Sequence, residues 1–512
     1  MLKVRTTKTG SGSTAVQVVT RYRNRTQIVK HIGSAKNPED VSSLLKLAHQ
    51  YIRGADPTKP LFEEFQQAQK THLVDVENLV FNRTYHSFSY EFLSYFYELT
   101  GFQKLSDQII KDLVIMRILE PCSKRASLEL LKEYFAITHG HTTMYQTIKK
   151  IGEQKPEIEK MAVSYAKNNL SFDFSLVFYD VTTLYFESFK EDEDTTSEKG
   201  AIIKKGLRRN GFSKDNKSNQ PQIVIGLIVT REGFPVSCDV FEGNTFEGKT
   251  FIPTIVKFKN THAVKTLTVV ADAAMISYEN VQELLKADLS YIVGARMGNL
   301  KPTQIKEVAK QLVNVDCAST RIETERGLLV CDFSLIRYRK DKREMEKQIA
   351  KAQKLLDENK ALTRTKFIKT NKATQTLNTD LVEKTTLLLG IKGYYTNLTD
   401  ETNQTIINHY HSLWHVEKAF RVAKSDLEAR PIFHHKRESI EAHILIVFIS
   451  LCVTKAVELL TKQSIQKVKR DIWRILDIEF TDSLSGQIFT RRMDASASPM
   501  AKLWKTLPKI KI

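Results

Sequence analysis

Apolar positions recur every three or four residues along most of the segment from Pro38 to about Leu170. Ile109, Leu113 and Met116 show this spacing, which is close to the 3.6-residue period of an α-helix. A helix with such a pattern has one apolar face to bury against its neighbours. The segment is therefore predicted to form a helical domain.

The pattern changes near Phe172, where short apolar runs replace the helical spacing. Gly233 separates two of these runs and provides the turn of a hairpin. A helical pattern over Glu279–Lys286 precedes the last run, so we expect a mixed α/β sheet with flanking helices. The runs predicted as strands are Leu176–Tyr179, Ile223–Thr230, Phe234–Phe241, Leu267–Ala271 and Tyr291–Ala295.

A less regular segment, residues 299–396, is predicted to be an insertion into this α/β core. Arg321–Tyr338 has the pattern of β-structure, and Lys340–Lys360 that of a highly charged helix. Thr385–Ile391 is predicted to be a strand. Helix is then expected from Asp400 to Leu460, which returns the chain to the core.

The two ends of the chain carry patterns of their own. Thr14–Thr20 and Gln27–Ile32 are predicted as the strands of a hairpin around an Arg-rich turn, and Arg491–Ile512 as a loose tail interrupted by prolines. The predicted domains are a basic hairpin arm (1–37), a helical domain (38–170), the first part of the core (171–298), the insertion (299–396), the second part of the core (397–465) and a basic C-terminal tail (466–512).

Charge adds a partner class to this picture. The 512 residues include 77 Lys+Arg and 59 Asp+Glu, a net charge of +18, which attracts polyanions and makes nucleic acid the leading class of partner. The first 38 residues hold eight Lys/Arg and no acid. These cations either contact DNA directly or only protect an exposed hairpin edge from aggregation. The helical domain is the other candidate for DNA binding.

Cysteine usage and apolar content bear on location. The five cysteines are an odd number without a CxxC pair, which fits a reducing compartment and makes the cytoplasm the expected location. Met1–Arg5 lacks the apolar core of a signal peptide. Ile444–Val453 is too short for a membrane span, which needs about 20 apolar residues. We expect this segment to be a buried helix, and we expect the protein to have no membrane partner.

Two aspartates lie at the ends of predicted strands. Asp180 follows Leu176–Tyr179 and Asp272 follows Leu267–Ala271. Carboxylates at adjacent strand ends can hold Mg²⁺, and two such ions about 3.5 to 4 Å apart can catalyse phosphodiester cleavage. Taken singly, either aspartate fits a structural role in capping a turn better than a role in catalysis.

A later helical segment adds a third carboxylate. In a continuous helix, Tyr410, Leu413, Glu417, Arg421 and Lys424 would lie along one narrow stripe. An aromatic ring, a carboxylate and two cations would then share one face. The alternative is a solvated salt-bridge face, supported by the i,i+4 spacing of Glu417 and Arg421.

Two further groups of residues have weaker patterns. The spacing of His434, His435 and His443 fits no common zinc motif, so structural or phosphate-contacting histidines are expected. A basic loop follows the acidic run Glu191–Asp194, and it is either a DNA track or solvated loop charge. Its cations are Lys204, Lys205, Arg208, Arg209, Lys214 and Lys217.

The chain resembles the insertion-sequence transposases of the DDE superfamily, in the IS-four-like group with the signature Tyr-x2-Arg-x3-Glu-x6-Lys. Tyr410, Glu417 and Lys424 match this spacing, and Leu413 stands where the group has Arg. Other segments of similar content and order are YDVTTLYFES from Tyr179, GNTFEGKT from Gly243, ADAAMIS from Ala271 and the later RPIFHH. The resemblance covers about Phe172 to Leu451.

The resemblance implies an RNase H-like catalytic core with Asp180, Asp272 and Glu417 as a triad that binds two Mg²⁺ or Mn²⁺ ions. It further implies that Tyr410 and Lys424 contact the transposon end. Arg421 could replace the missing arginine as a phosphate contact, or it could pair with Glu417 and hold that carboxylate in place.

The predicted function is that of a DNA transposase. It would bind the ends of its own insertion sequence, cut with water and join the freed 3′-hydroxyl to target DNA, with double-stranded DNA as partner and as a homodimer assembled on that DNA. The alternatives are a two-metal nuclease of the same fold and a catalytically inactive, transposase-derived DNA-binding protein.

Overall fold

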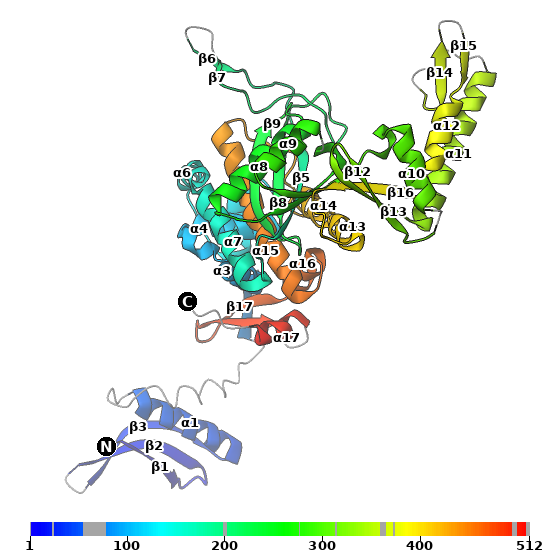
Figure 1. The fold of residues 1–512 in the computed structure, drawn as a ribbon. Helices are drawn as coiled ribbons and strands as arrows, with labels where there is room; N and C mark the ends of the chain where they lie inside the picture. The colour runs from blue at the N-terminus through cyan, green and yellow to red at the C-terminus, as the bar shows by residue number, and fades with distance from the viewer. Residues whose placement is uncertain are drawn as a thin grey trace. The chain divides into compact units, whose positions relative to one another are not determined.

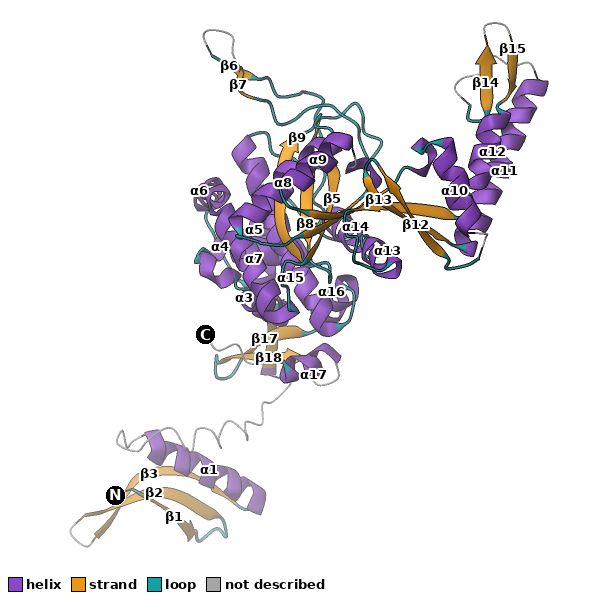
Figure 2. Ribbon diagram, viewed as in Figure 1, coloured by secondary structure: helices purple, strands orange, loops and turns teal. Residues whose placement is uncertain are grey.

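A computed structural model describes most of the chain, and it divides into two compact units. One unit consists of Met1–Val80 with Thr481–Gln487, and the other of Phe81–Phe480 with Ile488–Ile512. Figures 1 and 2 show the elements within each unit. The described residues are 2–22, 25–54, 78–197, 202–275, 277–312, 315–358, 365–371, 374–493 and 499–507.

The N-terminal unit is a three-stranded antiparallel sheet covered by one helix. Its strands, in the order β1-β2-β3, are β1 (Lys3–Lys8), β2 (Thr14–Tyr22) and β3 (Arg25–Ala35). Helix α1 (Pro38–Gly54) packs on the sheet, and Val16, Val18 and Ala48 form the centre of the shared core.

The expected hairpin arm is therefore incomplete in two respects. The two predicted strands lie within β2 and β3, but β1 escaped prediction because Lys3–Lys8 has Val4 as its single aliphatic residue. Helix α1 was assigned to the helical domain, whereas it covers the apolar face of this sheet. The alternating apolar residues of β2 need such a cover. Arg23, one of the eight cations, lies outside the described residues.

Helices gather on one side of the second unit, as the periodicity predicts. They are α3 (Ser87–Leu99), α4 (Gln108–Leu119), α5 (Lys124–Phe135), α6 (His141–Ile151), α7 (Lys155–Leu170) and α15 (Arg437–Thr461). Helix α15 contacts α3, α4, α6 and the sheet. In the described ranges it is the one helix long and apolar enough to cross a membrane, and 78% of its apolar window is buried in the fold. The prediction of a buried helix is confirmed.

An eight-stranded sheet forms the centre of this unit, in the order β12-β13-β16-β11-β10-β5-β8-β9. Strand β5 pairs antiparallel with β8, which pairs antiparallel with β9, and β10 and β11 run parallel to β5. This is the predicted RNase H-like arrangement. The strands are β5 (Leu176–Tyr185), β8 (Gln222–Val229), β9 (Pro235–Glu242), β10 (Thr268–Ala271) and β11 (Ser290–Gly294).

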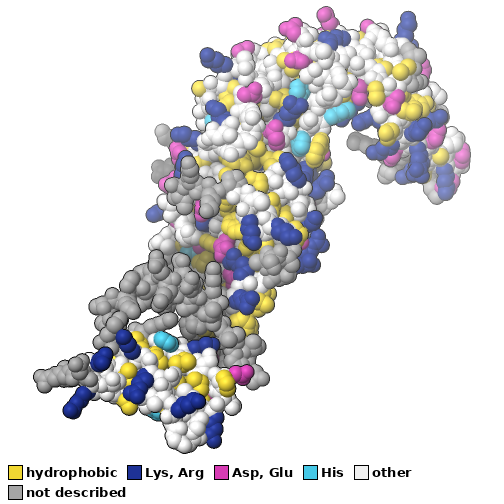
Figure 3. All heavy atoms as spheres, turned by 90° about the horizontal axis from the view of Figure 1, so that it is seen from below, with side chains coloured by type: hydrophobic (Ala, Val, Ile, Leu, Met, Phe, Trp, Pro, Cys, Tyr) yellow, Lys and Arg dark blue, Asp and Glu magenta, His cyan; other side chains and the backbone are white. Residues whose placement is uncertain are grey.

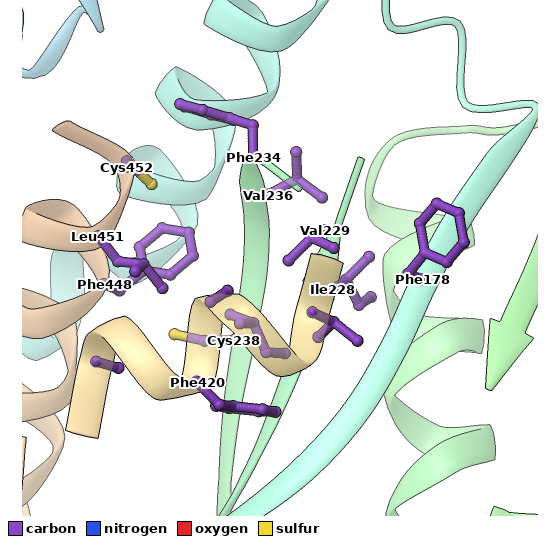
Figure 4. Close-up of a cluster of buried hydrophobic side chains, with 14 of the residues drawn as sticks. Phe178, Ile228, Val229, Phe234, Val236, Cys238, Phe420, Phe448, Leu451 and Cys452 are labelled. Carbon is purple, nitrogen blue, oxygen red and sulfur yellow. The ribbon is translucent and has the colours of Figure 1, made fainter. Parts of the chain in front are cut away.

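Helices cover both faces of this sheet (Figure 1). On one face α8 (Glu247–Thr261) receives the Tyr179 hydroxyl, which donates to Thr250 Oγ1 at 2.8 Å. On the other face, apolar side chains of α15 and of α14 (Trp414–Arg421) meet β8 and β9, as Phe448, Phe420 and Cys238 illustrate in Figure 4. Helix α9 (Tyr278–Lys286) lies between β10 and β11, as predicted.

The insertion extends the core sheet. Strands β12 (Ser319–Thr324), β13 (Gly327–Phe333) and β16 (Ile391–Thr396) continue the sheet beyond β11. Figure 1 shows the remaining elements as a protrusion from this end. They are α10 (Pro302–Leu312), α11 (Leu335–Asp357), α12 (Thr379–Leu387) and the hairpin of β14 (Ile368–Asn371) and β15 (Thr374–Leu377).

Two predictions within the insertion need correction. The predicted strand Thr385–Ile391 is wrong, because residues up to Leu387 complete α12 and the strand begins at Ile391. The hydroxyl of Thr385 donates to the Leu381 carbonyl one turn back, so this β-branched residue is accommodated in a helix. The charged helix starts at Leu335 rather than Lys340, and residues 359–360 lie outside the described residues.

The C-terminal region, residues 466–512, consists largely of regular structure: α16 (Ile465–Trp473), β17 (Leu476–Asp482), β18 (Ile488–Met493) and α17 (Pro499–Thr506). Within Arg491–Ile512, predicted to be loose, the described residues form the end of β18 and α17, so that prediction is wrong for them. Strands β18 and β17 form a sheet with β4 (Leu79–Tyr85). The Trp504 ring lies 5.9 Å from the Phe88 ring, and Arg492 bonds both Asp477 and Glu91. These contacts with residues far away in the sequence hold the C-terminal segment in a defined structure. Residues 494–498 and 508–512 lie outside the described residues.

Candidate active site

The strand register brings Asp180 and Asp272 next to each other. Ala271 of β10 is paired with Tyr179 of β5 in a parallel ladder, so each aspartate is the next residue on neighbouring strands. Side chains alternate along a strand, and Tyr179 points to α8, so Asp180 faces the layer that contains α14. Both carboxylates therefore lie where the β5–β10 ladder ends. Asp272 follows β10 as predicted, whereas Asp180 lies inside β5, which continues to Tyr185.

The environment of Asp180 disfavours its charge. Burial, together with the negative charges of Asp272 and Glu247, raises the pKa of Asp180 to about 7, while Lys214 acts in the opposite direction. A buried carboxylate beside other carboxylates binds a proton or a cation more readily than an isolated one. The site therefore has the electrostatic character of a cation site.

Tyr410 bonds Asp272 and lies within electrostatic range of Glu417. It is buried in α13 (Asn403–His411), and its hydroxyl donates to Asp272 Oδ1 at 3.3 Å. Burial raises the pKa of Tyr410, and Asp272, Glu417 and Asp180 all act in the same direction. All three predicted triad carboxylates are thus within electrostatic range of one hydroxyl group.

These carboxylates are near one another, but their side chains do not form a complete set of metal ligands in this structure. Among the described residues, no group of three or more His, Cys, Asp or Glu side chains is close enough to hold a metal ion. Glu417 is exposed on α14, whereas Asp180 is half-buried on β5. Metal binding by all three would need the Glu417 side chain to turn towards the two aspartates.

The helix that carries the signature is interrupted, so the predicted single stripe from Tyr410 to Lys424 is wrong. Helix α13 ends at His411, α14 begins at Trp414, and a π-helical turn occupies Val422–Asp426. A π turn adds a residue to the helical repeat and rotates the residues after it about the helix axis. Pro431 lies in the non-helical stretch between this turn and α15. A proline has no N–H to donate to a helical hydrogen bond, so it fits a position outside the helices.

This geometry separates two of the three predicted DNA contacts, Arg421 and Lys424, while the third, Tyr410, is buried against Asp272. Lys424 is directed to Asp215, with its Nζ 3.2 Å from Oδ2, and Arg430 lies 3.3 Å from the same carboxylate. Arg421 is exposed, and it forms no ion pair with Glu417 among the described residues. Leu413, at the position of the signature arginine, is buried in the core.

A lysine outside every predicted motif lies over Tyr410. Lys392 of β16 has its Nζ 4.5 Å from the centroid of the Tyr410 ring. Burial and the charge of Arg337 lower the pKa of Lys392, while Asp332, Asp272 and Glu417 oppose that shift. No local pattern marks this residue, because only the pairing of β16 with β11 brings it to the site.

The basic loop and the histidines have mainly structural partners. Arg208 pairs with Asp192 at 2.6 Å and Arg209 with Asp194, so the acidic run neutralises part of the loop. Lys214 donates to the Val181 carbonyl at 2.7 Å and pairs with Glu247 at 2.8 Å, beside Asp180. Within the loop, residue 201 and the side chain of Lys204 lie outside the described part of the chain.

The three histidines of the later segment lie in a network of cations. The Lys124 amine donates to His434 Nε2 at 2.9 Å and to His443 Nδ1 at 3.0 Å, and His435 Nδ1 lies 2.8 Å from Arg208. Burial lowers the pKa of His434 to about 3 and that of His443 as well. The structural role expected for these histidines fits this arrangement.

Comparison with known proteins assigns the family. A family model described as a transposase DDE domain matches residues 172–453, more than half of the chain. The comparison with curated proteins gave no match. One similar solved structure is a piggyBac transposase synaptic complex with hairpin DNA, at 10% identity and a TM-score of 0.35, with 82% of this chain and 74% of that chain covered.

A second is the Mos1 mariner paired-end complex with Mn, at 14% identity and a TM-score of 0.16, with 50% of this chain and 78% of that chain covered. Similarities this low carry no argument by themselves, so the assignment depends on the domain match and on the sheet topology. The chain belongs to the DDE transposases and is a DNA transposase.

Proposed function

We propose that this transposase is a member of the IS-four-like group with the Tyr-Arg-Glu-Lys signature and acts on the ends of its own insertion sequence. It cuts a strand with water and joins the freed 3′-hydroxyl to target DNA. The observation that carries this proposal is the register of β5 and β10, which makes Asp180 and Asp272 neighbours. The coupling of both aspartates and Glu417 to Tyr410 supports it.

Asp180, Asp272 and Glu417 would hold two Mg²⁺ or Mn²⁺ ions. The raised pKa of Asp180 fits such a role, because its excess of nearby negative charge is relieved by a cation. Bound ions of this kind activate the attacking oxygen and stabilise the leaving oxygen. The chain itself orients Asp272 through the Tyr410 hydroxyl and places Lys392 over the Tyr410 ring.

The partners in this proposal are double-stranded element ends and target DNA, bound by a homodimer that assembles on the DNA. The net charge of +18 supports DNA as the partner. We further propose a cytoplasmic location, which fits the free thiols of all five cysteines.

Metal binding can be tested without measuring activity. Mg²⁺ or Mn²⁺ at saturating concentration is expected to raise the melting temperature by roughly 2 to 5 °C, because a ligand that binds only the folded state stabilises it. Asp180→Asn should remove this rise, whereas Asp239→Asn, at an acid of β9 paired with Lys155, should retain it. Differential scanning calorimetry with and without metal measures both. An equal rise in Asp180→Asn would contradict the proposed metal site.

The role of Arg421 can be separated from that of Glu417. If Arg421 contacts a phosphate of the transposon end, Arg421→Ala should weaken metal-free binding to that DNA about 10- to 100-fold, the value of a charged hydrogen bond. Arg421→Lys should lose less, because it keeps the charge. Fluorescence anisotropy with labelled end DNA in EDTA measures the affinity. Unchanged metal-free affinity in Arg421→Ala would show that Arg421 does not contact a phosphate of the transposon end.

A further inference from the structure

Helix α1 covers one face of the N-terminal sheet, and among the described residues no helix or strand covers the other, which we call the open face. Val16 and Val18 of β2 point to α1, so the alternation along the strand puts Gln17 on the opposite face. Arg5 is paired with Gln17, and Gln17 with His31, across the three strands. A row of Arg, Gln and His therefore crosses the middle of the open face.

Cations flank this row. Lys3 lies two residues before Arg5, and Arg21 lies four residues after Gln17, so both share the open face by the same alternation. Both are exposed, and neither forms an ion pair with another described residue. The first acid of the chain is Glu39. Figure 3 shows Lys and Arg side chains over the surface of this unit.

The placement of these residues argues against mere protection of a sheet edge. Gln17 and Arg21 belong to β2, which is the central strand and has no open edge. Edge protection needs charges on β1 or β3 only. Lys30 of β3 differs from these residues because it lies on the face covered by α1, where its Nζ is 4.6 Å from the centroid of the Tyr51 ring.

Arg5, Gln17, Lys3 and Arg21 are side chains of the kinds that read double-stranded DNA. Val19 and Ile28, paired in one row with Lys3, share the face with them. Arg bonds guanine and Gln bonds adenine in the major groove, while Lys neutralises phosphates. The groove is about 12 Å wide and admits strands of a β-sheet. Gln17 Nε2 lies 3.5 Å from His31 Nδ1, and His31 Nε2 lies 3.3 Å from Ser34 Oγ, so neighbours on the sheet hold the row in place.

We propose that the open face of β1, β2 and β3 reads base edges in the major groove of the element end, with Arg5 and Gln17 as base contacts and Lys3 and Arg21 as phosphate contacts. The identity of this DNA as the element end rests on the proposed function. In this proposal the sheet recognises the DNA sequence. The carboxylate site acts on the phosphodiester backbone, which is the same in every sequence, so it provides no sequence recognition.

A selection experiment with the full-length protein tests this inference. Wild-type protein is incubated with a library of duplexes that carry a randomised segment, and bound DNA is amplified and sequenced. We expect enrichment of one motif. Arg5→Ala with Gln17→Ala should lose that enrichment by at least tenfold, because each bidentate base contact discriminates by about 1 to 3 kcal/mol.

Phosphate contacts have a different signature. Lys3→Ala should reduce the slope of log affinity against log salt by about 1, on any duplex sequence. Lys46→Ala is the matched control, because Lys46 is exposed on α1, away from the open face. Circular dichroism and melting curves of each variant establish that it is folded.

The outcomes separate this inference from the proposed function. The same motif and affinity in wild type and in Arg5→Ala with Gln17→Ala would overturn the inference, as would a wild-type protein that enriches no motif. Loss of salt dependence in Lys46→Ala but not in Lys3→Ala would also overturn it. Motif selection without metal-dependent cleavage would count against the proposed function alone.

Discussion

Asp180→Asn, Asp272→Asn and Glu417→Gln are each expected to reduce metal-dependent strand cleavage by about a thousandfold or more. Each substitution removes a negative oxygen ligand while keeping the size of the side chain. The metal ions provide several kcal/mol of transition-state stabilisation, and each 1.4 kcal/mol corresponds to a factor of ten in rate. Cleavage of labelled duplex DNA, followed on denaturing gels, measures the effect.

A neighbouring acid provides the comparison. Glu247 also affects the charge of Asp180, but it is paired with Lys214 at 2.8 Å, so Glu247→Gln should retain most of the cleavage. Metal-free DNA binding should survive in all four variants, since no carboxylate attracts a phosphate. Near wild-type cleavage in Glu417→Gln together with inactivity of Glu247→Gln would make Glu247 the third ligand instead.

His434 and His443 are expected to lower the free energy of unfolding by about 3 kcal/mol between pH 7.5 and pH 5.5, and Asp180, whose pKa is raised to about 7, offsets part of this fall because its folded carboxyl takes up a proton in the same range. Burial lowers the pKa of both imidazoles below the ordinary value of 6.5, so at pH 5.5 the unfolded chain takes up protons that the folded chain does not. Each group then costs about 1.4 kcal/mol per pH unit below 6.5. Stability is therefore lost as the pH falls through 6.5.

Urea titrations followed by circular dichroism at three pH values measure this loss. His434→Gln should make the fall smaller than in wild type by about 1.4 kcal/mol, half of the histidine contribution, because the amide oxygen still accepts from Lys124 but does not titrate. His141→Gln, at an exposed histidine, should leave the loss unchanged. A pH dependence identical in wild type and His434→Gln would show that this imidazole does not contribute.

The strands of the core could be predicted because each is a short apolar run buried on both faces. Ile223–Thr230 is an example, since every residue of β8 is buried. The same pattern singled out Asp180 and Asp272, although Asp180 lies inside β5, which continues to Tyr185. The resemblance to the transposase signature, together with the spacing, led to Tyr410 and Glu417. Local sequence was sufficient wherever burial on two faces leaves few alternatives.

Features that depend on distant partners could not be predicted in this way. The C-terminal strands are half polar, and their order depends on contacts such as Arg492 with Glu91. Lys392 reaches Tyr410 only because β16 inserts beside β11. The break at Leu413 and the π turn after Arg421 change a helical register that periodicity treats as uniform.

The shared sheet decides which parts of the insertion are dispensable. Strand β16 is hydrogen-bonded to β11 on one side and to β13 on the other. Removal of residues 299–396 as a block would strip β11 of its neighbour and leave a buried row of N–H and C=O groups open to pairing with another chain. The hairpin of β14 and β15 forms a separate two-stranded sheet with no pairing to the core strands. Its length can therefore vary, whereas β13 and β16, which extend the core sheet, must be kept.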